Sequence, residues 1–124
     1  MKYLWTTINV KNMEESITFY SELAGLKMLN RFPAGPGREI AFMGNGIENE
    51  TLVELMADNG NNEVKHSESV SIGFAVDSID AMLDTVKSKN IPVHGAPIET
   101  PAFKFFTVKD PNGLNVQFFQ QKNK

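Results

Sequence analysis

One order of predicted elements occurs twice along the chain: a strand, a helix and then three strands. The first copy covers residues 1–58 and the second covers residues 69–121. A shift of 66 positions places Ile8 on Phe74, so the two copies keep the same spacing. A repeat of this kind indicates two supersecondary units, because one unit alone leaves a face of its sheet uncovered.

Alternating apolar residues predict the strands, and apolar residues at helical spacing predict the two helices. Asn12 precedes Glu15 at the spacing of a capping box, and Gly25 is a typical residue after a helix end. We expect helices within 11–25 and 77–90, and strands over 1–10, 26–32, 38–44, 51–57, 69–76, 91–99, 102–110 and 114–120.

The stretch 58–69 is polar and without periodicity, and we interpret it as a linker between the copies. The predicted fold is α+β, a single domain in which two βαβββ units form a curved, cleft-bearing mixed sheet with the helices on its outer face. A ferredoxin-like βαββαβ domain is the alternative. It has two strands between its helices, whereas this sequence predicts four.

Composition excludes several classes of function. The 124 residues include 12 Lys or Arg and 15 Asp or Glu, a net charge of −3, so neither nucleic acid nor a membrane surface is an expected partner. Cysteine is absent, which removes disulfides, thiolate nucleophiles and Cys-ligated zinc. No apolar run approaches the roughly 18 residues of a membrane span, and a strand pattern begins at the N-terminus in place of a signal peptide. We therefore expect a cytoplasmic protein.

The candidate binding residues lie on the strand faces turned away from the predicted helices. Alternation places Trp5 and Thr7 there in the first strand, and Glu54 is the lone carboxylate of its strand. Glu54 and Gln117 lie 63 residues apart, close to the repeat shift, and are equivalent positions. Aromatic rings beside a few polar groups suit a small organic ligand. The candidate ligand-binding residues are Trp5, Thr7, Glu54, Ser71, Phe105, Gln117 and Phe119.

Four of these candidates also have a purely structural interpretation. Trp5 is a large side chain that often lies in a core, and Glu54 can pair with a lysine or face solvent. Ser71 is small enough to allow close packing, and Gln117 can be an ordinary exposed strand residue. The equivalence of the positions under the repeat favours the functional interpretation.

Three stretches, "ESITFYSELAGLKM", "LVELM" and "FTVKDPNGLNVQFF", make the chain similar to the glyoxalase/bleomycin-resistance/dioxygenase (vicinal oxygen chelate) superfamily. The "DPNG" turn before the last strand is the most specific of these features. The resemblance implies a fold of paired βαβββ units, in agreement with the repeat. It also implies a homodimer, with units that pair within one chain or across two.

In metal-dependent members such as glyoxalase I, the resemblance implies four ligands: His or Gln, Glu, His, and Glu. Those positions fall on Trp5, Glu54, Ser71 and Gln117 of this chain. Only Glu54 is a strong donor, whereas a Ni²⁺, Zn²⁺ or Fe²⁺ site needs several imidazole or carboxylate ligands. We therefore expect no bound metal and no other cofactor.

Three functions remain open. The favoured one is a small-molecule-binding protein with a metal-free cleft, because three of the four ligand positions lack a good metal donor. The second is a glyoxalase I-type lyase or isomerase that uses a metal or uses Glu54 as a proton acceptor. The third is a non-catalytic structural or regulatory dimer. His66 and His94 lie in loop-like stretches and are not expected beside Glu54.

Overall fold

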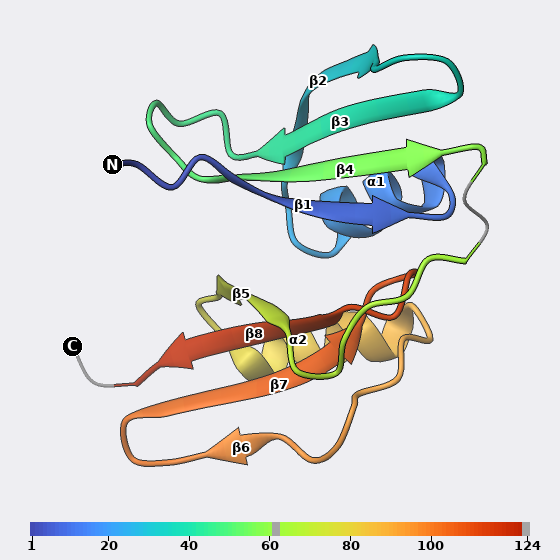
Figure 1. The fold of residues 1–124 in the computed structure, drawn as a ribbon. Helices are drawn as coiled ribbons and strands as arrows, with labels where there is room; N and C mark the ends of the chain where they lie inside the picture. Colours follow the sequence, from blue (N-terminus) through green and yellow to red (C-terminus); the bar gives the residue numbers. More distant parts are fainter. Residues whose placement is uncertain (61–62, 123–124) are drawn as a thin grey trace. The chain divides into compact units, whose positions relative to one another are not determined.

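The structure is a computed structural model that describes residues 1–60 and 63–122. The chain divides into two compact units, Met1–Lys65 and His66–Lys124, and each contains a strand, a helix and three strands (Figure 1). The division falls within the stretch 58–69 that the sequence indicates as a linker, of which residues 61–62 lie outside the described residues.

Unit 1 has a mixed four-stranded sheet in the order β1-β4-β3-β2. β1 runs parallel to β4, and the other neighbouring pairs are antiparallel. Its elements are β1 (Trp5–Val10), α1 (Met13–Glu22), β2 (Lys27–Pro33), β3 (Arg38–Gly44) and β4 (Leu52–Asp58).

Unit 2 repeats this topology with the order β5-β8-β7-β6. β5 runs parallel to β8, and the remaining pairs are antiparallel. Its elements are β5 (Ser71–Ala75), α2 (Ile79–Ser88), β6 (Ile98–Glu99), β7 (Phe103–Lys109) and β8 (Asn115–Gln121). The predicted α+β fold with two βαβββ units is confirmed.

Both helices begin at a side-chain cap in the same position of the repeat. The Oδ1 of Asn12 accepts a hydrogen bond from the backbone N–H of Glu15 at 2.9 Å. The Oγ of Ser78 accepts one from the backbone N–H of Ala81 at 3.1 Å. A cap of this kind stabilises a helix by about 1 kcal/mol, so the start of each helix is fixed locally by its own sequence.

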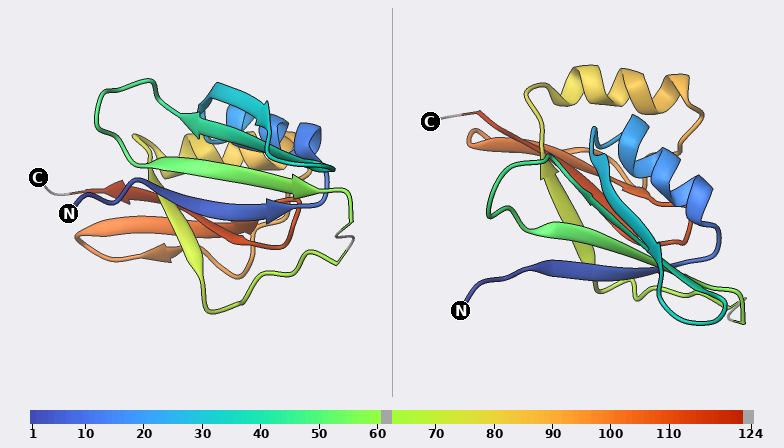
Figure 2. Two further views of the ribbon diagram at one scale, coloured as in Figure 1. Left: turned by 45° about the horizontal axis from the view of Figure 1, so that its top comes forward. Right: turned by 90° about the horizontal axis from the view of Figure 1, so that it is seen from above.

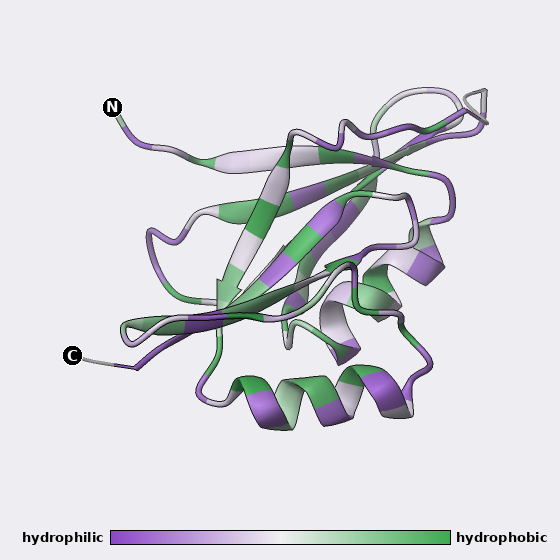
Figure 3. Cartoon of the chain, turned by 90° about the horizontal axis from the view of Figure 1, so that it is seen from below, coloured by the Kyte–Doolittle hydropathy of each residue, from purple (hydrophilic) through white to green (hydrophobic). Residues whose placement is uncertain are grey.

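Each helix packs on one face of its own sheet, and the core of each unit lies between the two (Figure 2). Alternate strand residues point toward the helix, and α2 carries apolar and polar stripes that alternate along its length (Figure 3). The fully buried apolar side chains are Ile8, Val10, Tyr20, Ala41, Met43 and Leu55 in unit 1 and Ile79, Val86, Phe106, Val108, Val116 and Phe118 in unit 2.

Two local predictions differ from the structure. The strand expected over 1–10 begins only at Trp5, so Leu4 precedes β1 and is 50% exposed. The strand expected over 91–99 is reduced to the two residues of β6 and an isolated bridge at Val93. Pro92 and Pro97 explain this, because proline has no N–H for a strand ladder.

Neither α1 nor α2 is long and apolar enough to cross a membrane, and these are the helices of the described residues.

Candidate functional site

The sheet of unit 1 has one face that α1 does not cover, and Glu54 lies in its middle. On one side Glu54 is the ladder partner of Thr7 in β1, and on the other it is the ladder partner of Phe42 in β3. Ladder partners point to the same face of a sheet. Trp5 and Leu52 form another pair of ladder partners, two residues before Thr7 and Glu54, and they point to the same face.

Aromatic rings line this face beside Glu54. The ring of Trp5 meets the ring of Phe42 edge to face, with centroids 5.5 Å apart and planes at 64°. Phe42 in turn lies 6.1 Å from Phe32 of β2. The edge-to-face pair of Trp5 and Phe42 is favourable because the positive edge of one ring meets the negative face of the other, whereas the planes of Phe42 and Phe32 are tilted by 30°. The three rings therefore form a continuous aromatic surface across β1, β3 and β2, which we call the aromatic platform.

Glu54 is a buried carboxylate without a cationic partner. It is 8% exposed and accepts a hydrogen bond from the Thr7 hydroxyl. Among the described residues, no Lys, Arg or His forms an ion pair with it. Buried glutamates are normally paired, because moving a charge out of water is costly. Its burial beside neutral groups sets Glu54 apart from the exposed carboxylates of the chain.

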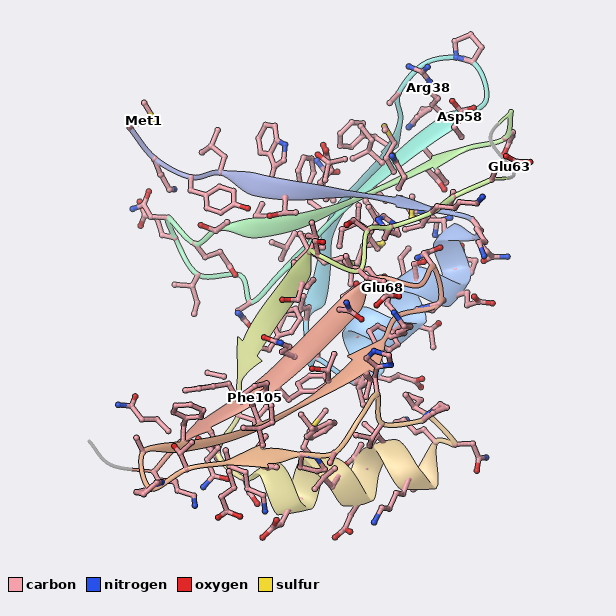
Figure 4. The ribbon with its side chains drawn as sticks, turned by 60° about the horizontal axis from the view of Figure 1, so that its bottom comes forward. Met1, Arg38, Asp58, Glu63, Glu68 and Phe105 are labelled. Atoms are coloured by element: carbon pink, nitrogen blue, oxygen red, sulfur yellow. The ribbon has the colours of Figure 1, made fainter. Side chains whose placement is uncertain are left out.

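Both arginines of the chain lie in unit 1 and bind other carboxylates. Arg31 reaches the helix side of the sheet, where its guanidinium lies 2.6 Å from Glu14 and 2.9 Å from Glu39. The pKa of Glu39 is lowered by the hydrogen bonds from Arg31, and the pKa of Arg31 is raised by the same contact and by Glu14. Arg38 binds Asp58 at 3.1 Å at the end of the sheet (Figure 4). Neither guanidinium neutralises Glu54.

The corresponding face of unit 2 has an aromatic end. Phe103 stacks on Phe119 at 5.3 Å and lies 6.0 Å from Phe105, which is labelled in Figure 4. Phe105 and Phe119 are ladder partners between β7 and β8. Gln117 follows on the same face, opposite Gly73 of β5.

The other end of this face is polar, and its groups bind one another. Lys109 Nζ lies 2.6 Å from Glu68 Oε1 and 3.0 Å from the side-chain oxygen of Asn115. The Asn115 amide donates to the backbone oxygen of Glu68 at 3.2 Å. Lys109 holds the pKa of Glu68 below its ordinary value. These contacts hold Glu68, which precedes β5, against β7 and β8 of the same unit.

The structure brings the predicted residues together within each unit. Trp5, Thr7 and Glu54 share the uncovered face of unit 1, while Ser71, Phe105, Gln117 and Phe119 share that of unit 2. Sequence reasoning missed Phe42 and Phe32 of the aromatic platform. Phe42 could have been found by pairing the predicted strands 38–44 and 51–57 as antiparallel neighbours. That pairing places Phe42 opposite Glu54.

The side chains at the four positions that the family resemblance assigns to metal ligands do not fit a glyoxalase-type site. The indole of Trp5 offers no lone pair to a metal, and Ser71 and Gln117 are neutral oxygen donors. Glu54 is the one carboxylate of the set. Over residues 1–60 and 63–122, no group of three or more His, Cys, Asp or Glu side chains could hold a metal ion. His94, whose backbone N–H bonds Thr107, is exposed.

A family model described as the Glyoxalase/Bleomycin resistance protein/Dioxygenase superfamily matches residues 2–118. The chain belongs to this superfamily. Among the relatives of this glyoxalase-superfamily protein, a lactoylglutathione lyase of Neisseria meningitidis serogroup B is 30% identical over 128 residues, covering 99% of this chain and 93% of the relative.

Solved structures agree with the fold. The trypanothione-dependent glyoxalase I of Leishmania major superposes with a TM-score of 0.85 at 25% identity, over 97% of this chain and 86% of that one. TnmS3, an antibiotic binding protein from Streptomyces, superposes with a TM-score of 0.73 over 98% of this chain and 97% of its own. At 19% identity, the second likeness concerns the fold alone.

Proposed function

We propose that this glyoxalase-superfamily protein binds a small organic molecule on the uncovered face of the unit 1 sheet, without a metal. The observation that carries the proposal is Glu54, a carboxylate 8% exposed between the Thr7 hydroxyl and the Phe42 ring. Sites for small molecules are typically lined by apolar and aromatic side chains with a small number of oriented polar groups. Trp5 supplies a ring that a ligand can reach, because it is 43% exposed.

We also propose that the equivalent face of unit 2, considered by itself, contacts a ligand through Ser71, Phe105, Gln117 and Phe119. Its aromatic end offers rings for stacking, and the Gln117 amide offers both a hydrogen-bond donor and an acceptor. Such a surface supports binding of an uncharged, partly aromatic group.

Metal analysis followed by metal titration tests the proposal. We expect purified, unchelated protein to contain less than stoichiometric metal, and Ni²⁺, Zn²⁺ and Mn²⁺ to leave the fluorescence of Trp5, the single tryptophan, unchanged. Small aromatic compounds are expected to shift that fluorescence in the same metal-free protein. Stoichiometric metal that perturbs Trp5 would overturn the metal-independent site.

A lactoylglutathione lyase-type activity is the second candidate, because relatives that carry this name match nearly the whole chain. In this case Glu54 would act as the proton acceptor, since it is a buried carboxylate beside the aromatic platform and forms no ion pair among the described residues. The assay follows lactoylglutathione in the presence of each metal. Activity that Glu54→Gln abolishes and Glu22→Gln preserves would favour the enzyme over the binding protein. Glu22 is a suitable control because it is exposed at the end of α1.

We further propose that the protein is a homodimer, as the family resemblance implies. β1 and β5 are edge strands of their sheets, and an unpaired strand edge is a ready site for association. Large apolar side chains, Leu4 and Val70, are exposed beside these strands. Sedimentation equilibrium is expected to give twice the chain mass of 13.8 kDa, and a monomer at all concentrations would refute this assignment.

A further inference from the structure

We propose that Glu54 and the aromatic platform select an organic cation, an ammonium group attached to an apolar or aromatic body. This inference rests on the proposed function, because it names the ligand class of that same site. It follows from three observations: the unbalanced charge of Glu54, the exposure of the Trp5 ring, and the neutral residues at the equivalent position of unit 2.

The first observation concerns charge. The Thr7 hydroxyl is neutral and is the hydrogen-bond partner of one Glu54 oxygen. Both guanidinium groups are occupied elsewhere, Arg31 on the helix side of the sheet and Arg38 beside Asp58. Within the described residues, no cation is paired with Glu54. Burying the Glu54 carboxylate without a cation beside it costs free energy. A positively charged ligand would offset this cost by pairing with the carboxylate.

The second observation concerns the rings. A cation is attracted to an aromatic face within about 6 Å of the ring centroid, and tryptophan is the strongest of the three aromatic side chains in this respect. Trp5 stands edge to face with Phe42, and its side chain is 43% exposed, so solvent and ligand reach it. Phe42 is the cross-strand neighbour of Glu54. A carboxylate and an indole thus flank the same stretch of sheet surface.

The third observation is the contrast with unit 2. At the equivalent position Gln117 faces Gly73, so the carboxylate is replaced by a neutral amide and the Thr7 hydroxyl by a hydrogen atom. Ser71 stands in the place of Trp5, as the first residue of its strand. The nearby cation of that face, Lys109, is already bound to Glu68. At these equivalent positions of the described residues, the features that suit an ammonium group therefore occur in unit 1 and not in unit 2.

The test compares benzyltrimethylammonium with neopentylbenzene, in which a carbon atom replaces the charged nitrogen. Binding to the full-length protein is followed by Trp5 fluorescence and by isothermal titration calorimetry. We expect the cation to bind at least about tenfold more tightly than its uncharged isostere. Glu54→Gln is expected to bring the two dissociation constants within about twofold of each other, whereas Glu22→Gln retains the preference.

The outcomes separate the two proposals. Equal affinity of the unmodified protein for both probes overturns the cation preference and leaves a small-molecule site in place. Binding of neither probe overturns both the preference and the site. The comparison of the two probes in the unmodified protein needs no substitution. It therefore tests the cation preference even if circular dichroism shows that Glu54→Gln does not fold. A preference that Glu54→Gln retains in full assigns the charge recognition to other residues and also refutes the inference.

Discussion

Glu54 and Gln117 occupy the same register position in the two units. Glu54 is the ladder partner of Thr7, the third residue of β1, and Gln117 is the ladder partner of Gly73, the third residue of β5. A carboxylate and its isosteric amide thus stand at one structural position of a duplicated fold. Because unit 2 builds the same sheet with a neutral residue, the topology does not require the charge of Glu54.

Glu54→Gln is therefore expected to stabilise the protein. The substitution removes a buried charge that has no cationic partner, and the amide oxygen still accepts the hydrogen bond from Thr7. We expect the free energy of unfolding to rise by about 1 kcal/mol, within the range measured for burying polar groups. Urea denaturation at neutral pH measures the change. Glu22→Gln, on the exposed part of α1, is expected to change it by less than about 0.5 kcal/mol. A destabilised Glu54→Gln would show that the carboxylate contributes to the fold.

Phe42→Leu tests the aromatic platform. It keeps an apolar side chain opposite Glu54 but removes the ring that meets Trp5 at 5.5 Å. We expect a loss of stability of about 1 kcal/mol and an emission of Trp5 at longer wavelength, because the indole loses a packing partner. Phe19→Leu is the matched control, since Phe19 lies on α1 and packs against Tyr20. It should lower stability without moving the emission maximum, and an equal spectral shift in both variants would argue against a local platform.

The fold was largely predictable because its information is local and repeated. The caps at Asn12 and Ser78 and the alternation of the strands each act within a few residues, and the same arrangement recurs after 66 positions. The exception is the stretch 91–99, where alternation suggests a strand. Its two prolines have no backbone N–H to donate to a strand ladder, so only a two-residue strand forms.

The site was less predictable because it depends on pairing between distant strands. Trp5 and Glu54 follow from alternation within single strands. The position of Phe42 opposite Glu54 follows only from the register of β3 on β4. Likewise, the burial of Asn115 depends on its contacts with Glu68 and Lys109, which lie outside its own strand.

Gly44→Ala is expected to disturb the aromatic platform through the side chain of Leu52. A Cβ added at Gly44 would lie 2.6 Å from Leu52 Cδ2 and 3.0 Å from both Leu29 Cδ1 and Glu50 Oε1, so these side chains must shift. Because all three atoms are the ends of flexible side chains, we expect a loss of about 1 kcal/mol, at the low end of the cost of overpacking. Because Leu52 is the ladder partner of Trp5, we also expect a change in Trp5 emission. Gly73→Ala is the matched control in unit 2, where the nearest atom to the added Cβ is the Gln117 backbone oxygen at 4.0 Å. Equal stability losses would refute the steric explanation.

The loop between β3 and β4 is expected to lose stability in acid through Glu50. Its carboxylate accepts hydrogen bonds from the backbone N–H groups of Asn45 at 2.7 Å and Ile47 at 2.6 Å. These bonds favour the charged form, and they lower the pKa of Glu50 from its ordinary value of 4.5. The stabilisation is therefore fully present above pH 4.5, and it is lost as the pH falls through the lowered pKa of the folded protein.

Glu50→Gln separates this contribution from those of the other carboxylates. At pH 7 the variant is expected to be less stable than the unmodified protein, because the amide is a weaker acceptor for the N–H groups of Asn45 and Ile47. As the pH falls below 4.5, the difference in unfolding free energy should narrow, since the unmodified protein then loses the same charge. Glu48→Gln in the same loop is the control, because Glu50 is the acceptor of the Asn45 and Ile47 N–H groups, and it should change the free energy of unfolding at pH 7 by less than about 0.5 kcal/mol. A Glu50→Gln difference that stays constant, or widens, on acidification would mean that the loop is not held by the charged form of Glu50.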